Sequence, residues 1–180
     1  MQLNPETTDL ARYLDADTEV DWRHPAIAAQ ARELFAGCRD DASAIRAAFE
    51  FVRDAVPHSW DIGSRRVTRT ASEVLLAREG ICYAKSMLLA ALLRWRGIPT
   101  GFCYQHLTLG NTPDTGYCIH ALNAVYLTDR KLWMRIDARG NTNGKNAQFI
   151  PGREQLAFPV RPEFGEYDLP IMYAAPHPAT

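Results

Sequence analysis

The spacing of apolar residues predicts an amphipathic helix over residues 42–55. Ile45, Phe49 and Val52 recur there at i, i+4 and i+7, which is the spacing of a buried stripe on one helix face. Pro57 follows the pattern and cannot continue a helix, because proline lacks the backbone N–H and its ring clashes with the preceding turn. We therefore expect this helix to end just before residue 57.

An earlier helix is expected over residues 24–37. Pro25 suits the first helical position, where the missing N–H has no intrahelical partner in any case, and Gly37 suits the end. The preceding segment, 1–21, mixes short apolar and acidic stretches and is expected to form a strand or an irregular lead-in.

A short helix is predicted after the polar and aromatic loop 56–69. Thr70 and Glu73 have the spacing of a capping box, in which each side chain accepts a hydrogen bond from the other residue's backbone. Gly80 is expected to end this helix, since glycine accepts the left-handed conformation that commonly closes one.

A buried helix is predicted directly after this point. The run Met87–Trp95 is almost continuously apolar and is followed by Gly97, a typical stop. Cys82 precedes the run closely enough to lie in the first turn, where unpaired N–H groups and the helix dipole stabilise an anion.

Two further segments, 119–127 and 133–137, have the composition of strands. The turn-like break 128–130 separates them, so an antiparallel hairpin is the simplest arrangement. If the loop is centred between Thr128 and Asp129, His120 lies directly opposite Asp137 with both side chains on one face. A shift by one residue would separate them.

The order of these elements predicts one α+β domain spanning 1–180, with helices first and an antiparallel sheet after them. Residues 100–109 alternate well enough for another strand. We divide the domain into a helical N-terminal part (1–69), a core (about 70–141) and an extended C-terminal wrap (147–180). The last segment is aperiodic and rich in proline, so we expect it to end in a loose tail.

Composition excludes several classes of function. The chain is 47% hydrophobic and 23% charged, with 20 basic and 21 acidic residues, so nothing indicates a nucleic-acid or membrane surface. No run approaches the roughly 18 apolar residues of a transmembrane helix, and no signal peptide is visible. We therefore expect a cytoplasmic protein whose four cysteines are free thiols: Cys38, Cys82, Cys103 and Cys118.

Candidate chemistry centres on Cys82. A thiolate at a helix start is a better nucleophile than an ordinary cysteine, but it needs a base and a group that orients the base. His120 and Asp137 are the matching residue types on the predicted hairpin. Each residue alone would more often be structural, and only the three together favour catalysis.

At this point the chain resembles the transglutaminase-like superfamily. The resemblance runs from about Thr70 to Asn141, and it is carried by Ala71–Leu75, Gly80–Cys82, Ala91–Arg94, Gly97–Pro99, His120–Ala121 and Asp137. It implies a papain-like (cysteine-proteinase) fold, in which the helix bearing the nucleophile packs on an antiparallel sheet. It also implies a catalytic triad of Cys82, His120 and Asp137. The chemistry of such a triad requires no cofactor, and the sequence has no acidic cluster with the spacing of a calcium loop.

The sequence departs from the family pattern at two places. Leu122–Asn123 follows the His120 motif where many members have Trp and an acid or Asn, and Ala138–Gly140 follows Asp137 where Pro-Thr or Pro-Ser is more usual. Both changes leave the triad residues in place and bear on the substrate groove.

An oxyanion hole would need a second donor besides the backbone N–H of Cys82. In transglutaminase-like enzymes a Trp or Tyr side chain can supply it, so Trp60 is the candidate, with His58 as an alternative and Gln105 as a weaker one. A tryptophan in this loop could equally be part of the core or a groove wall.

A zinc site is an alternative reading of the cysteines and histidines in the predicted strands. Cys103-x-x-His106 and Cys118-x-His120 offer zinc-type ligands. On a strand, Cys103 and His106 point to opposite faces, and ligation by His120 would remove the base. The pattern therefore favours catalysis without a metal.

The sequence thus predicts a cysteine-dependent acyl-transfer enzyme that acts on an amide or isopeptide bond of a peptide or protein through a thioester, with hydrolysis favoured over transamidation. Three alternatives remain open: a protein-glutamine transamidase, acyl transfer from a thioester donor as in arylamine N-acetyltransferases, and a non-catalytic binding module on the same fold. The sequence does not fix the oligomeric state.

Overall fold

The computed structural model of the chain describes residues 3–110 and 112–177. The helices are η1 (Leu10–Leu14), α1 (Pro25–Phe35), α2 (Asp41–Ala55), α3 (Ala71–Ala77), α4 (Cys82–Trp95), η2 (Pro113–Thr115) and η3 (Pro162–Phe164). The strands are β1 (Asn4–Pro5), β2 (Thr100–Thr108), β3 (Tyr117–Leu127), β4 (Leu132–Ile136), β5 (Gln148–Ile150), β6 (Arg153–Gln155), β7 (Tyr167–Asp168) and β8 (Ile171–Met172). The start of the lead-in, 1–2, residue 111 and the end of the tail, 178–180, lie outside the described residues.

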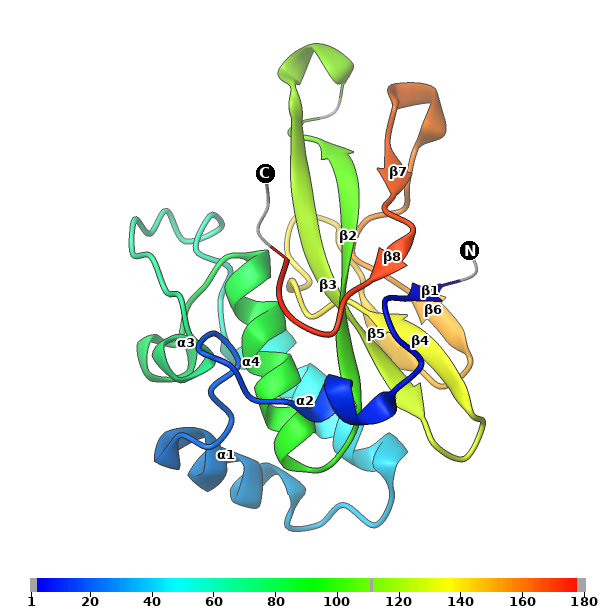
Figure 1. Ribbon diagram of the computed structural model, residues 1–180. Helices are drawn as coiled ribbons and strands as arrows, with labels where there is room; N and C mark the ends of the chain where they lie inside the picture. Colours follow the sequence, from blue (N-terminus) through cyan, green and yellow to red (C-terminus); the bar gives the residue numbers. More distant parts are fainter. Residues whose placement is uncertain (1–2, 111, 178–180) are drawn as a thin grey trace.

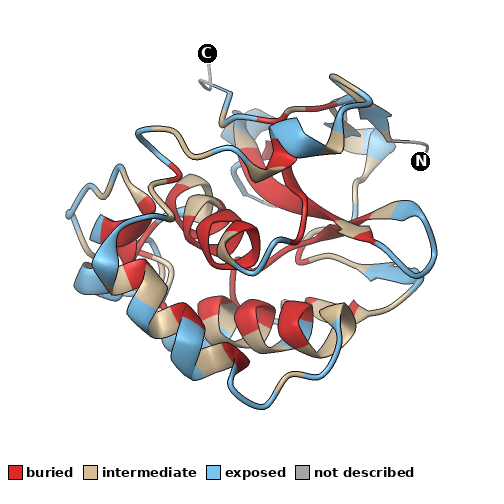
Figure 2. Cartoon of the chain, turned by 60° about the horizontal axis from the view of Figure 1, so that its bottom comes forward, coloured by how far each residue is buried: buried red, intermediate tan, exposed pale blue. Residues whose placement is uncertain are grey.

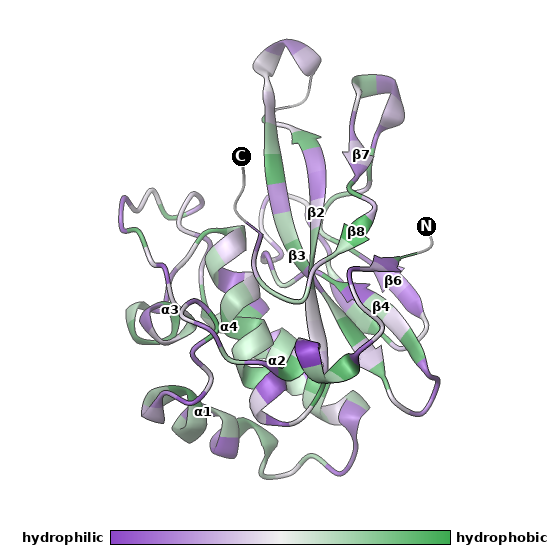
Figure 3. Cartoon of the chain, viewed as in Figure 1, coloured by the Kyte–Doolittle hydropathy of each residue, from purple (hydrophilic) through white to green (hydrophobic). Residues whose placement is uncertain are grey.

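Helix α4 lies between the other helices and the sheet (Figure 1). Its residues are buried along most of its length, as Figure 2 shows, and its middle is apolar (green in Figure 3). Both faces of the helix are therefore covered, and this explains why the Met87–Trp95 run reads as continuously apolar rather than amphipathic. No helix in the described part of the chain is long and apolar enough to cross a membrane.

The short helix α3 begins as the sequence predicts. The backbone N–H of Glu73 donates to Thr70 Oγ1 at 3.2 Å, and Glu73 Oε2 accepts from the Thr70 N–H at 3.3 Å, which completes the capping box. The prediction that Gly80 ends it is wrong. Arg78 closes the helix in the left-handed conformation (φ 55°), and a Cβ at Gly80 would lie 2.9 Å from the Ala84 Cβ. Because Gly80 has no side chain, the backbone that leads into α4 can lie close to the first turn of that helix.

The main sheet has the order β4-β3-β2-β7 and its pairings are antiparallel. The hairpin is formed, but the predicted register is wrong by two residues. Asn123 pairs with Ile136, so the continued register would set Asp137 opposite Leu122 rather than His120. The loop comprises residues 128–131, so its centre lies between residues 129 and 130, one residue later than expected. Because side chains alternate with a period of two, this shift leaves His120 and Asp137 on the same face.

The C-terminal segment wraps around the sheet in short strands. β5 and β6 form a small hairpin, β7 extends the main sheet beside β2, and β8 pairs with β1 in parallel. The N-terminal lead-in therefore consists of one short strand and the 3₁₀ helix η1. A strand near the start of the chain and one near its end thus pair in this small sheet, and the chain continues from β8 away from β1 (Figure 1).

Candidate active site

Cys82 is the first residue of α4. Its neighbour Ile81 occupies the N-cap position and offers no side-chain acceptor to the free N–H groups of the first turn. The Cys82 side chain is half-buried. The helix end therefore presents its unpaired donors and positive dipole end to the sulfur or to an oxyanion beside it.

His120 and Asp137 lie in direct contact. The distance from His120 Nε2 to Asp137 Oδ2 is 2.9 Å, and the two side chains are 4% and 1% exposed. Asp137 also accepts the backbone N–H groups of Arg139 and Ala157, both at 3.1 Å. Burial by itself raises the pKa of this carboxyl, but the charge of His120 and these hydrogen bonds outweigh it and lower the pKa. The carboxylate is therefore charged and held in one orientation.

The His120 ring contacts Phe158 and Asp137. Phe158 meets it edge-on, with ring centroids 4.9 Å apart and an interplanar angle of 77°. Nε2 is engaged by Asp137, so Nδ1 is the nitrogen left to exchange a proton with a thiol. The β3–β4 pairing begins at Asn123, so His120 and Ala121 precede the paired part of β3 on that side.

Cys82 is coupled to this histidine. Burial alone raises the pKa of the thiol, but hydrogen bonds from His120 and His58, the charge of His120 and the Ala121 backbone N–H lower it to about 6. In turn, burial lowers the pKa of His120, whereas its contacts with Asp137 and Cys82 raise the pKa well above the ordinary value. The arrangement thus favours a thiolate beside an imidazolium.

His58 is the second histidine at the sulfur. Its backbone forms a parallel bridge with Gly80, and the Ser59 N–H donates to the Gly80 carbonyl at 3.1 Å, which fixes the loop against the start of α4. His58 Nδ1 accepts the backbone N–H of Trp60 at 3.3 Å. A neutral His58 ring therefore carries its proton on Nε2 and is a hydrogen-bond donor.

The other two candidates for the second oxyanion donor, Trp60 and Gln105, have different surroundings from His58. The Trp60 side chain is 81% exposed, and its residue contributes the backbone N–H to His58. The Gln105 side chain donates to Asp168 Oδ1 at 2.9 Å, within a network on the sheet face. The geometry therefore favours His58 over Trp60 as the donor near Cys82. The role of Trp60 stays a prediction.

A buried ion pair holds the His58 loop in place. Arg139 binds Asp61 through both terminal guanidinium nitrogens, Nη1 and Nη2, with Nη2 2.7 Å from Oδ1, and the Thr142 hydroxyl donates to Asp61 Oδ2 at 2.6 Å. These contacts lower the pKa of Asp61 strongly. Arg139 occupies the stretch after Asp137 where the sequence departs from the family pattern.

The other three cysteines are less suited to nucleophilic chemistry. Burial raises the pKa of Cys103 to about 12 and also raises the pKa of Cys118. Cys38 is half-buried beside the end of α1. Within 3–110 and 112–177, no three His, Cys, Asp or Glu side chains are grouped so that they could hold a metal ion.

Comparison with known proteins identifies the family. No curated protein matches the chain. The family model of the transglutaminase-like superfamily matches residues 28–138, which include all three candidate catalytic residues.

Two solved structures share the fold. One is the "Putative Cysteine Protease" from Cytophaga hutchinsonii, at 19% identity and a TM-score of 0.60, covering 74% of this chain and 43% of that one. The other is the periplasmic domain of TgpA from Pseudomonas aeruginosa, at 18% identity and a TM-score of 0.54, covering 72% and 48%. The chain thus spans less than half the length of either structure. The α+β arrangement, with the Cys82 helix packed on an antiparallel sheet, is confirmed, and the chain belongs to the transglutaminase-like superfamily.

Proposed function

We propose that the protein is a cysteine-dependent acyl-transfer enzyme that opens an amide or isopeptide bond of a peptide or protein. The observation that carries the proposal is the buried His120–Asp137 contact at 2.9 Å, with Cys82 at the first position of α4 and coupled to the same imidazole. A nucleophile, a base and an orienting carboxylate in this order are the requirements of covalent acyl transfer.

In the first half-reaction the Cys82 thiolate attacks the amide carbonyl carbon and a C–S bond forms. The proton that left the thiol resides on His120, and it passes to the departing amine as the C–N bond breaks. Asp137 keeps the imidazole oriented and stabilises its charged form throughout. The product of this step is a thioester on Cys82 and a free amine.

The tetrahedral intermediate carries a negative oxygen that needs hydrogen-bond donors. The backbone N–H of Cys82 at the helix start is one, and we assign the second to the Nε2–H of His58, which lies beside the sulfur. Donors held in place before the reaction stabilise such an oxygen without reorganisation. In this proposal His58 takes the place expected for Trp60.

In the second half-reaction, water attacks the thioester carbon and transfers a proton to His120, which releases an acid and restores the thiol. We favour water over an amine as the acceptor. A lysine-type acceptor needs an acidic groove, whereas the cavity next to His120 contains the cation Lys145. Transamidation of glutamine is the runner-up. A non-catalytic module fits less well, because all three residue types of the triad are in place.

The pH dependence of Cys82 alkylation tests the proposal. The thiolate exists above the lowered pKa, so labelling by iodoacetamide should rise through about pH 6 and level off above it. An ordinary cysteine reaches that plateau only above about pH 8.5. Mass spectrometry of quenched samples at pH 6.5 should find Cys82 labelled well ahead of Cys38, Cys103 and Cys118. Preferential labelling of another cysteine, or a Cys82 profile that rises only above pH 8, would contradict the assignment.

Competition between water and an amine distinguishes the two fates of the thioester. With a glutamine-containing peptide and a primary amine present, we expect release of the acid or of ammonia at a rate insensitive to the amine concentration. The measurement is product mass together with ammonia assay. Dominant incorporation of the amine would reject hydrolysis and leave the Cys82 chemistry intact.

A further inference from the structure

A cavity of about 380 Å³ adjoins the candidate catalytic histidine. Phe158, which lines it, packs edge-on against the His120 ring, and Ala157, also in its lining, donates its N–H to Asp137. Leu107 on β2 lines it as well and pairs with Cys118, two residues before His120 on the same face of β3. The cavity therefore begins at the residues that hold the catalytic pair.

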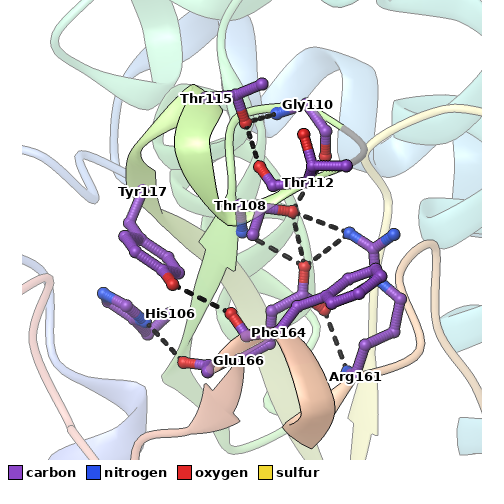
Figure 4. A network of polar contacts seen from close by, with 10 residues as sticks. His106, Thr108, Gly110, Thr112, Thr115, Tyr117, Arg161, Phe164 and Glu166 are labelled. Carbon is purple, nitrogen blue, oxygen red and sulfur yellow. Dashed lines mark hydrogen bonds and ion pairs between the residues drawn. The ribbon is translucent and has the colours of Figure 1, made fainter.

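One polar part of the cavity lining consists of Thr108, Arg161 and Glu166, and these residues hydrogen-bond to one another rather than facing a ligand unpaired (Figure 4). Glu166 Oε1 accepts the Thr108 N–H at 3.1 Å, the Thr108 hydroxyl at 2.7 Å and Arg161 Nη2 at 2.6 Å. Its Oε2 accepts the Arg161 backbone N–H at 2.9 Å and Nε at 3.1 Å. These donors lower the pKa of Glu166 to about 2, so the wall carries one anion and one cation that neutralise each other.

Another part of the lining carries a second cation, Lys145. Lys145 Nζ lies 5.3 Å from the centroid of Phe158 and donates a long hydrogen bond of 3.4 Å to the Thr142 carbonyl. Within the described ranges, no carboxylate lies within ion-pair distance of it. Arg139 and Asp61, whose charges act on Lys145, bind each other. The cavity therefore has one positive charge in excess, in a half-buried position.

Much of the remaining lining is apolar. Leu107, Leu109, Ala157 and Pro159 contribute hydrocarbon surface, and Asn143 adds an amide. A ligand that matches this cavity has a short aliphatic part for these residues and an anionic end for Lys145. A carboxylate satisfies an ammonium with a charge-assisted hydrogen bond, and a neutral amide does so more weakly.

We propose that this cavity is a subsite for an acidic side chain, of glutamyl or aspartyl type, that flanks the scissile amide of the substrate. The proposal rests on the proposed function and narrows it to acidic peptides. Lys145 binds the carboxylate, the apolar wall packs on the methylene groups, and Phe158 joins the subsite to His120.

The test uses binding rather than turnover, so it does not depend on the acyl-transfer chemistry. The Cys82→Ala protein is titrated with two capped tripeptides, acetyl-Gly-Glu-Gly-amide and acetyl-Gly-Gln-Gly-amide, and backbone amide shifts of residues 143–145 are followed by NMR. We expect the acidic peptide to bind roughly tenfold more tightly, which is the size of one charge-assisted hydrogen bond in a partly solvated site. The preference should fall as salt is added.

Matched lysine variants identify the group responsible. In the Cys82→Ala background, Lys145→Gln should reduce the affinity for the acidic peptide to that for the neutral one. Lys131→Gln, in the exposed β3–β4 turn, should change neither affinity. Equal binding of the two peptides, no binding of either, or a preference that survives Lys145→Gln would overturn the subsite. Failure of the proposed function itself is recognised separately, by the alkylation profile of Cys82 in the unmodified protein.

Discussion

Replacement of His120 by alanine, or of Cys82 by serine, is expected to lower kcat/KM by at least about 10³-fold for any peptide amide that the protein turns over. A serine hydroxyl is not ionised beside the imidazole, and without His120 the thiol loses the hydrogen bond and the charge that lower its pKa. The two replacements combined should cost little more than the worse single one, because the residues act as a unit.

Asp137→Asn should cost less than the loss of Cys82 or of His120. Asp137 accepts His120 and Ala157 at Oδ2 and the Arg139 N–H at Oδ1. An asparagine can keep its oxygen toward His120 only by turning its NH₂ group to the Arg139 N–H, where two donors would meet. In either orientation of the amide at least one of these hydrogen bonds is lost, and the charged imidazole also loses its buried counterion.

Steady-state kinetics and alkylation rates at pH 7 measure these effects, and thermal unfolding verifies that the variants fold. Cys118→Ser is the matched control. It makes the same chemical change two residues from His120, at a thiol whose pKa is raised rather than lowered, and should retain near-normal kcat/KM. Normal turnover by Cys82→Ser would reject the nucleophile assignment.

Local patterns in the sequence were sufficient to predict the elements that bear the candidate triad. The apolar run and its glycine stop predict α4, and the polar break predicts the β3–β4 hairpin. The hairpin register is off by two residues, yet His120 and Asp137 still share a face, since only an odd shift exchanges the faces of a strand.

The surroundings of the triad could not be predicted in the same way. The loop 56–69 has no periodicity, and its path is set by the bridge between His58 and Gly80 and by the ion pair between Asp61 and Arg139, 78 residues apart. Single-sequence patterns carry no information on such pairs. The acidic residue in the loop and the arginine after Asp137 were visible, but nothing in their spacing indicated that they meet.

The same limit applies to the cavity beside His120. Its lining comes from the end of β2, from the turn at 143–145 and from the segment 157–166, which are far apart in the chain. The proline-rich stretch could be predicted only as an extended wrap. In the structure it supplies Ala157 and Phe158, which contact Asp137 and His120. A region without periodicity thus completes the candidate site.

The largest expected effect on stability is at Arg94, a buried cation at the end of α4. Its guanidinium donates to three backbone carbonyls: Thr100 at 2.7 Å, Asp15 at 2.7 Å and Ala174 at 2.5 Å. These acceptors belong to the first strand after the helix, the end of η1 and the C-terminal wrap. Arg94 is 3% exposed, and burial lowers its pKa to about 10. One side chain therefore connects α4 to three segments from different parts of the chain.

Arg94→Met should lower the free energy of unfolding by about 3 kcal/mol, because methionine fills much of the space but leaves three carbonyl groups without their charged donor. For a chain of this length, the loss corresponds to a fall in Tm of roughly 6–12 °C, measurable by circular dichroism. Arg96→Met, two residues on and exposed, makes the same change without removing a buried donor and should shift Tm by no more than about 2 °C. If both variants melted together with the unmodified protein, the guanidinium would not be the tie between the helix and the two ends of the chain.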